Sequence, residues 1–160
     1  MLTIKTAENK LVEKTIVRDV IKLKSVAAYD MIDDRIGYIK LTTFSSSTDK
    51  EIVTALNSLK ERGMSKLILD LRFNGGGYLH QAIHVADQFL DKHQMIVYTK
   101  GAHTKKESQF ASEKGAFKSG DLVILVNSTT ASASEIVSGA IQDHKSCLLY
   151  TSPSPRDGIL

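Results

Sequence analysis

The serines at positions 132 and 134 stand where an apolar run gives way to a segment with helical spacing, a junction at which a nucleophile could be placed. The stretch reads NSTTASASEIVSGAIQDHK over residues 127–145. A serine oxygen at a helix N-terminus lies where the helix dipole favours negative charge, and the N–H of the next residue, Ala133, can donate to a carbonyl oxygen under attack. Ser132 is therefore a candidate nucleophile for acyl transfer.

The same spacing also has a purely structural interpretation. Ser132 followed by Glu135 has the form of a capping box, which explains both residues without any chemistry. A nucleophilic serine also needs a base, and the titratable residues Asp143, His144 and Lys145 come only 11 to 13 positions later. At about 1.5 Å per helical residue they would lie roughly 16 to 20 Å away, out of reach of the Ser132 proton.

A second turn, LDLRFNGGGYL, carries three consecutive glycines between an apolar strand and a helix. Glycines permit unusual backbone dihedrals, so that N–H groups can converge beside a helix N-terminus and hold a phosphate or an oxyanion. The phosphate-binding patterns do not fit, because His80 stands three positions after Gly77 and Tyr78 follows the last glycine where a P-loop has lysine. An oxyanion site and a plain turn both stay open.

Strand-like and helix-like segments alternate around these two turns, which predicts an α/β fold with a layered core and crossover connections. Strands are expected at residues 2–5, 15–17, 21–23, 35–44, 66–73, 95–101 and 121–127. Helices are expected on three apolar stripes, namely Ile52, Ala55, Leu56 and Leu59, then Leu79, Ile83, Ala86 and Leu90, then Ile136, Val137, Ala140 and Ile141. Residues 103–120 are expected as a polar excursion, ending in an ordinary connection beside the cleft.

The bulk composition sets limits on partners and cofactors. The 160 residues carry a formal net charge of +3, and the basic residues are scattered rather than clustered, so no nucleic-acid partner is expected. The single cysteine, Cys147, cannot form an internal disulfide, and no Cys/His cluster has metal-ligand spacing, so neither a metal nor a cofactor is expected. No apolar run approaches the roughly 18 residues of a transmembrane segment.

Taken together, the two turns and the strand before them resemble the C-terminal processing (tail-specific) serine peptidases of the S41 type. That family shows the blocks GYIKL..F, LDLR.N.GG and ASASEI..GA.QD in this order, and here they occupy residues 37–44, 69–77 and 131–143. The similarity covers about residues 15–145. Phe73 stands where many relatives have a small residue, and Gly75 where many have proline.

The resemblance implies an α/β core related to the crotonase and Clp protease folds, and a Ser–Lys dyad that cleaves protein substrates near their C-termini. Matched position by position, Ser132 is the nucleophile and Ser134 its neighbour, and the backbone N–H groups of Ala133 and Gly76 form the oxyanion hole. The supporting positions of the motifs are Asn74, Gly77, Glu135 and Asp143, of which Asp143 is expected to be structural. The implied partners are the C-terminal tails of proteins, and the implied location is the cell envelope or periplasm.

The domain organisation expected from the resemblance has three parts. Residues 1–25 resemble the last strands of a truncated PDZ domain and its linker, and residues 26–146 resemble the peptidase core. The family's lysine lies in a segment of the form VG..T.GKG..Q, which should fall near position 157, but this chain has CLLYTSPSPRDGIL there. Residues 147–157 resemble the translation of a transposase sequencing adapter. We therefore expect residues 147–160 to be a non-native tail, and the fragment to be inactive without its lysine.

Two other functions would use the same residues. A non-catalytic peptide-binding relative would keep the groove and perform no chemistry. A Ser–His hydrolase would take His80 or His84 as its base, although these residues, four apart on the expected helix, are explained equally well as helix-surface histidines.

Overall fold

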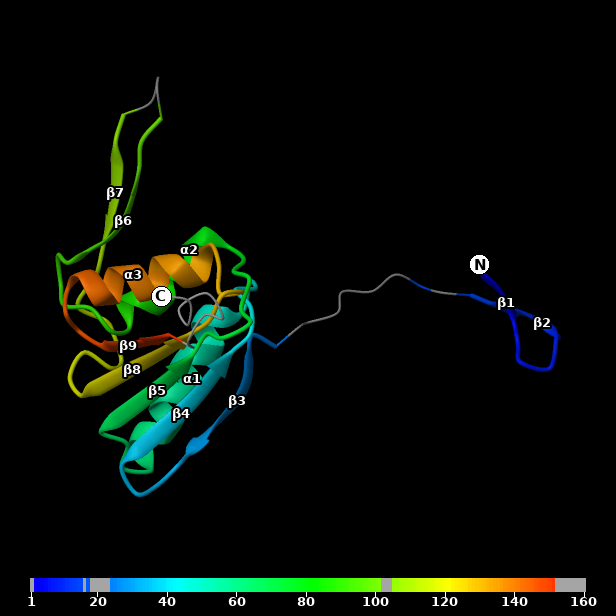
Figure 1. Ribbon diagram of the computed structural model, residues 1–160, viewed down its shortest axis with the longest axis horizontal. Coiled ribbons are helices and arrows are strands. Elements are labelled where there is room, and N and C mark those ends of the chain that lie inside the picture. The colour runs from blue at the N-terminus through cyan, green and yellow to red at the C-terminus, as the bar shows by residue number, and fades with distance from the viewer. Residues whose placement is uncertain (1, 16, 18–23, 102–104, 152–160) are drawn as a thin grey trace, which may run out of the picture.

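The centre of the fold is a five-stranded sheet with strand order β3-β4-β5-β8-β9 (Figure 1). The computed structural model describes residues 2–15, 17, 24–101 and 105–151. The strands β4 (Ile36–Leu41), β5 (Lys66–Asp70), β8 (Asp121–Val126) and β9 (Leu148–Thr151) are parallel, and β3 (Val26–Met31) pairs antiparallel with β4 at one edge. The predicted α/β class with crossover connections is confirmed.

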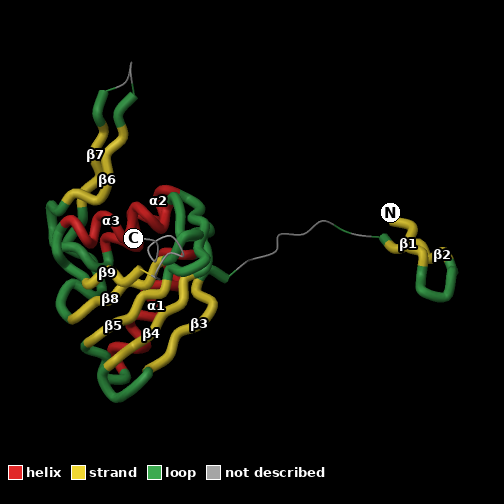
Figure 2. Tube along the Cα trace, viewed as in Figure 1, coloured by secondary structure: helices red, strands yellow, loops and turns green. Residues whose placement is uncertain are grey.

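Three helices lie in the connections between the parallel strands (Figure 2). They are α1 (Thr48–Glu61) between β4 and β5, α2 (Leu79–Asp87) between β5 and β8, and α3 (Ala133–Asp143) between β8 and β9. The predicted stripe of α1 is buried in full, and Gly63, at φ 96°, follows the end of the helix as expected. The stripe of α2 was wrong in part. Leu79 is 43% exposed, and the buried apolar residues of this helix are Ala82, Val85 and Ala86.

The core lies on one face of the sheet. Ile39, Leu69 and Ile124 stand side by side in the strand register, and all three are 0% exposed. On the same face the end of α1 closes over Gly37, where an added Cβ would collide with Met64 and Leu59. The helices also contact one another, α1 against α2 and α2 against α3. The helices therefore cover the apolar face of the sheet as one connected layer.

Neither β7 (Glu107–Phe110) nor β3 was predicted as a strand. β7 pairs with β6 (Met95–Thr99) to form a hairpin that projects from the body of the fold (Figure 1). The sequence of β7, ESQF, lies within the expected polar excursion, and its side chains are exposed or half-buried. Because neither face of the strand is buried, its sequence shows no alternation of apolar and polar residues that would predict a strand. β3, with sequence VAAYDM, likewise has mostly exposed side chains.

The N-terminal strands form a separate two-stranded sheet. β1 (Leu2–Lys5) is confirmed, whereas its partner is β2 (Leu11–Lys14) and not residues 15–17. The turn explains the difference, because the Thr6 N–H donates to the Lys10 carbonyl at 2.9 Å and pairing resumes at Leu11. The strand expected at residues 21–23 lies outside the described residues.

β9 lies within the segment expected to be a non-native tail. It continues the parallel sheet beside β8, with Thr151 opposite Val126 and Leu149 packed against the core. The non-native origin of residues 147–160 stays a prediction. In the described part of the chain, no helix combines the length and apolar character that a membrane crossing requires.

Candidate active site

The two turns singled out in the sequence meet at one edge of the sheet. β4, β5 and β8 are adjacent and parallel, so their carboxyl ends lie side by side, and each continues into a loop there. In open α/β sheets this edge is where ligands bind. The turn after β5 brings Asn74, Gly76 and Gly77 to this edge, and the turn after β8 brings Ser132 and Ala133.

Ser132 has a backbone conformation that helix capping does not explain. Its dihedrals are φ 57° and ψ −116°, whereas an N-cap residue ordinarily has φ/ψ in the β region. Residues with a side chain rarely adopt such values, and they persist mainly where a functional site requires them. A sharp strand-to-helix turn of this kind presents the nucleophile of the α/β-hydrolases. The Ser132 side chain is likewise exposed at the start of a helix.

The capping interpretation is also correct, so the two interpretations do not exclude each other. Ser132 and Glu135 form a capping box at the start of α3. The Glu135 carboxylate accepts a short hydrogen bond from the Ser132 N–H, and the Glu135 N–H donates to the Ser132 backbone oxygen at 2.9 Å. Glu135 therefore supports the strained turn. Ala133, the first residue of α3, makes no backbone N–H hydrogen bond within the described residues.

The glycine turn touches the serine turn directly. A Cβ added to Gly76 would lie 2.9 Å from the Ser132 Cβ, the Ala133 nitrogen and the Ala131 oxygen. Gly76 also has φ 101°, a conformation that favours glycine. Only glycine at this position allows the backbone after β5 to lie against the candidate nucleophile.

Asn74 joins the pieces of the site. It is 0% exposed, and its side chain donates from Nδ2 to the Leu41 carbonyl at 2.9 Å and accepts at Oδ1 from the Gly76 N–H at 2.9 Å. Its backbone carbonyl accepts from the Ala131 N–H at 3.1 Å and from the Ser134 hydroxyl at 3.1 Å. Ser134 is itself 0% exposed, so its hydroxyl is a structural donor and Ser132 is the accessible serine of the pair.

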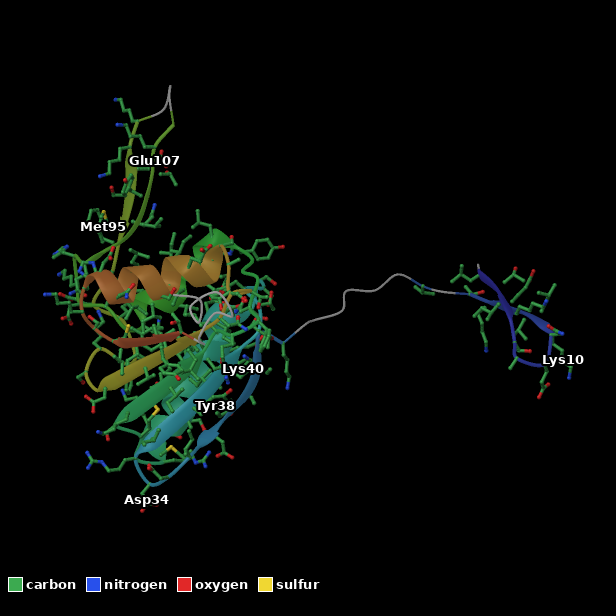
Figure 3. All side chains as sticks on the ribbon, in the orientation of Figure 1. Lys10, Asp34, Tyr38, Lys40, Met95 and Glu107 are labelled. Carbon is green, nitrogen blue, oxygen red and sulfur yellow. The ribbon has the colours of Figure 1, made fainter. Side chains whose placement is uncertain are left out.

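A buried carboxylate anchors the beginning of the glycine turn. Asp70 accepts hydrogen bonds from the Tyr38 hydroxyl at 2.8 Å, from the Lys40 ammonium at 3.0 Å, and from the backbone and guanidinium of Arg72. Burial alone raises the pKa of Asp70, but the hydrogen bonds from Arg72, Tyr38 and Lys40 outweigh it and hold this pKa well below its usual range. Figure 3 shows Tyr38 and Lys40 on β4. The sequence motifs contain Tyr38, Lys40, Asp70 and Arg72, but no role was predicted for these four residues.

None of the described lysines and histidines hydrogen-bonds to the Ser132 side chain. Lys40 is 20% exposed, and its ammonium is held by Asp70 and by the Arg72 carbonyl at 2.6 Å. His80 stacks on Tyr78 with ring centroids 5.5 Å apart. The structure therefore brings no support to the Ser–His alternative.

Two further residues raised as candidate bases, His84 and Asp143, lie away from the serine turn. His84, on α2, lines a groove between α1 and α2 together with Asp49 and Asp87. Asp143 is the last residue of α3, at the opposite end of the helix from Ser132, and it is exposed.

The comparisons with known proteins all point to one family. The family model of peptidase family S41 matches residues 35–154. The chain is 39% identical to a carboxyl-terminal-processing protease of Picosynechococcus sp. over 164 residues, which cover 99% of the chain and 39% of the relative. It is 42% identical to a protein of the same name from Synechocystis sp. over 92% of the chain and 35% of the relative. The chain thus spans well under half of the length of these relatives.

Solved structures show the same relationship. A photosystem II D1 C-terminal processing protease superposes with a TM-score of 0.67 at 29% identity, covering 87% of this chain and 38% of that one. A putative S41 protease from Bacteroides fragilis shares the fold, with a TM-score of 0.68 at 17% identity over 84% of this chain and 39% of that one. Sequence motifs, family match and fold lead to one conclusion, that this chain belongs to peptidase family S41.

Proposed function

We propose that this chain carries the nucleophile and the oxyanion-binding turns of a serine endopeptidase that cleaves protein substrates near their C-termini. The observation that carries the proposal is the backbone of Ser132, strained at φ 57° and exposed, with Gly76 packed directly against it. The names of the relatives, carboxyl-terminal-processing proteases, support the substrate class.

In the proposed reaction the Ser132 oxygen attacks the carbonyl carbon of the scissile peptide bond. The Ala133 N–H, beside the positive end of α3, and an N–H of the glycine turn stabilise the oxyanion that develops. The C–N bond then breaks, the amine leaves with a proton, and water releases the acyl group from the serine. Asn74, Gly77 and Glu135 support this geometry by fixing the two turns.

The serine proton needs an acceptor, and we assign this role to a lysine of a Ser–Lys dyad. Such a lysine must have its pKa lowered by burial before it can act as a base at neutral pH. Position 157, near which the family places it, is Asp157 in this chain. We therefore expect the 160-residue chain to be inactive by itself.

The N-terminal hairpin and the core architecture support two finer assignments. β1 and β2 form a sheet of their own, which fits the proposal that residues 1–25 are the end of a PDZ domain that selects substrate tails. The parallel sheet with its helices on one face fits a crotonase- or Clp-protease-like core.

The test is a chimera in which residues 147–160 are replaced by a segment of the form VG..T.GKG..Q. We expect the chimera to cleave an unstructured peptide and the unmodified chain to leave it intact. Ser132→Ala in the chimera should lower the rate by a factor of about a thousand or more, because nucleophile and base act as a unit. Ser128→Ala, at an exposed serine four positions earlier, is the matched control and should keep full activity.

Three outcomes would contradict the proposal. Cleavage by the Ser132→Ala chimera would exclude Ser132 as nucleophile. Cleavage by the unmodified chain would show that no added lysine is needed. A chimera that binds the peptide and leaves it uncut would favour the non-catalytic peptide-binding alternative.

A further inference from the structure

We infer that Asn127 and Phe73 form a subsite that holds the polypeptide substrate beside Ser132. The side-chain NH2 of Asn127 donates to a backbone carbonyl of the substrate, and the Phe73 ring packs against one of its apolar side chains. The inference rests on the proposed function, because it needs a peptide bound at Ser132. Two features of this edge of the sheet lead to it, an amide donor without an acceptor and a strained, exposed aromatic residue.

The side-chain oxygen of Asn127 holds its carboxamide in one orientation. Asn127 directly follows β8, and its Oδ1 accepts from the Phe73 N–H at 3.0 Å and from the Thr129 N–H at 3.3 Å. The Thr129 hydroxyl donates to the same atom at 3.0 Å. A backbone N–H can only donate, so the atom that these groups share must be the oxygen of the carboxamide.

The nitrogen of the same carboxamide has no acceptor. Within the described residues Nδ2 of Asn127 makes no hydrogen bond, and it is not a buried atom. Nδ2 lies on the other arm of the planar carboxamide, so its N–H groups are directed away from the donors that hold Oδ1. Binding sites use a few oriented polar groups of this kind to fix a ligand. A backbone carbonyl of a bound peptide is the acceptor that fits this donor.

Phe73 is both strained and exposed. Its φ is 65°, in the left-handed region that bulky residues rarely adopt, and its exposed fraction is 74%. Neither backbone geometry nor burial therefore favours phenylalanine at this position. The Lys40 ammonium lies 5.8 Å from the centroid of the ring, which leaves most of the ring surface open. Strained residues of this kind persist mainly at functional sites.

Both residues lie close to the candidate nucleophile. The Asn127 N–H donates to the Thr130 hydroxyl oxygen at 3.0 Å, and Thr130 is two residues before Ser132, which keeps the Cα atoms of Thr130 and Ser132 within about 7.6 Å. On the other turn, Phe73 precedes Asn74, whose carbonyl accepts from the N–H of the residue before Ser132 at 3.1 Å. An extended peptide advances about 3.3 Å per residue, so a substrate attacked by Ser132 can reach both groups within a few residues of the scissile bond.

The two groups match the two kinds of surface that an extended peptide presents. Its backbone carbonyls need hydrogen-bond donors, and its apolar side chains are stabilised when an aromatic ring removes them from water. The hydrogen bond between Asn127 and the Phe73 N–H fixes both residues before the peptide binds. Such preorganisation lowers the entropic cost of binding.

The experiment uses the 160-residue chain and a peptide α-ketoamide with leucine residues on both sides of the ketone. The Ser132 oxygen adds to the ketone carbon: the Oγ–C bond forms, the serine proton passes to the former ketone oxygen, and nothing leaves. Because this hemiketal forms at equilibrium, it does not require a lysine. A ¹³C label at the ketone carbon reports the adduct, and Ser132→Ala is the control for ketoamide that is not bound to the serine.

NMR spectra of the ¹⁵N-labelled chain test the donor directly. We expect an NH2 proton of Asn127 to shift downfield when the adduct forms. The NH2 of Asn74 already donates to the Leu41 carbonyl at 2.9 Å and should stay in place, so it serves as the internal reference.

Asn127→Asp separates the donor from the structural oxygen. The variant keeps an oxygen that can accept from Phe73 and Thr129, and it replaces the NH2 by a second oxygen that repels a carbonyl. We expect the adduct to weaken about tenfold while the urea midpoint of unfolding is kept. Asn57→Asp, at an exposed position on α1, makes the same change in charge and should leave the adduct unaffected.

Phe73→Asn tests the ring. Asparagine tolerates a φ of 65° better than phenylalanine, so this variant should unfold at higher urea concentration. We nevertheless expect it to bind the leucine ketoamide about fivefold less tightly, since the apolar contact is lost. With serine in place of leucine in the ketoamide, the loss should disappear. A residue with only a structural role would not gain stability and lose binding together.

The outcomes that contradict the subsite leave Ser132 as the nucleophile. An unshifted Asn127 NH2, or an Asn127→Asp adduct as tight as that of the unmodified chain, would exclude the donor. An undiminished leucine adduct of Phe73→Asn would exclude the ring. Failure of the unmodified chain to form any adduct beyond that of Ser132→Ala would instead overturn the proposed function on which the inference rests.

Discussion

Gly76 and Ser132 are packed so closely that a side-chain carbon on Gly76 would lie 2.9 Å from the Ser132 Cβ. Two turns separated by more than 50 residues are therefore one structural unit. The contact joins the end of β5 to the start of α3, and it makes the shape of each turn depend on the other.

Gly76→Ala should disrupt this unit. The new methyl group would meet three backbone or Cβ atoms at 2.9 Å, and φ 101° is strained for alanine. We expect a loss of about 2 kcal/mol or more in the free energy of unfolding, measured with urea. Gly75→Ala is the matched control, because a Cβ there meets nothing within 4 Å. Equal stability of the two variants would show that the turns are not in contact.

Asn74→Ala should separate the three loops at the edge of the sheet. The substitution leaves the Leu41 carbonyl and the Gly76 N–H without their buried partner. We expect the free energy of unfolding to fall by about 2 to 4 kcal/mol, since each buried group left unpaired contributes about 1 to 3 kcal/mol. Ser134→Ala removes a single hydrogen bond to the Asn74 carbonyl and should have a clearly smaller effect. A larger effect at Ser134 than at Asn74 would contradict the assignment of Asn74 as the joining residue.

The Asp70 network predicts a pH dependence of stability. Hydrogen bonds from Arg72, Tyr38 and Lys40 hold the pKa of Asp70 below its unfolded value of about 3.9. Because the folded-state pKa is depressed, the stabilisation is fully present above the unfolded pKa and is lost as pH falls through the folded pKa.

Asp70→Asn is the variant that tests this dependence. Urea unfolding should find it about 2 kcal/mol less stable at pH 7, and the difference from the unmodified chain should shrink below about pH 4. Asp121→Asn is the comparison, because the Asp121 carboxylate pairs with Lys66 at the surface and its substitution should change stability far less. A difference for Asp70→Asn that stays constant down to pH 2 would rule out this linkage.

The sequence predicted most of the sheet and the residues at its edge. β5 and β8, along with the stripe of α1, are strongly apolar segments whose local pattern agrees with their burial. β7 was missed because an exposed hairpin strand gains its pairing from β6 and needs no apolar alternation. The buried face of α2 was misplaced because the residue that begins the helix, Leu79, stands beside the glycine turn and is not covered.

The sequence predicted which residues belong to the candidate site, but it did not predict how their backbone and side-chain groups are arranged. Motif positions pointed to Ser132 and the glycines, but they do not show which contacts hold the glycine turn in place. That information lies in the pairing of Phe44 with Gly77 and in the side chain of Asn74. The pairing of Phe44 with Gly77 and the hydrogen bond from Asn74 to the Leu41 carbonyl each join residues 33 positions apart, and no local pattern encodes them.

The strain in the Ser132 backbone should lower the free energy of unfolding, and this loss can be measured. A residue with φ 57° and ψ −116° is relieved by glycine and not by alanine. We therefore expect Ser132→Gly to unfold at higher urea concentration than Ser132→Ala, although both variants lack the nucleophile.

Glycine is also a better N-cap than alanine, so part of the difference comes from capping. The same pair of substitutions at Ser47, the N-cap of α1 with an ordinary φ of −111°, measures that part alone. The glycine-minus-alanine difference should be larger at Ser132 than at Ser47 by about 1 kcal/mol. Equal differences at the two caps would mean that Ser132 is an ordinary helix cap, and the main structural argument for its role as nucleophile would fall.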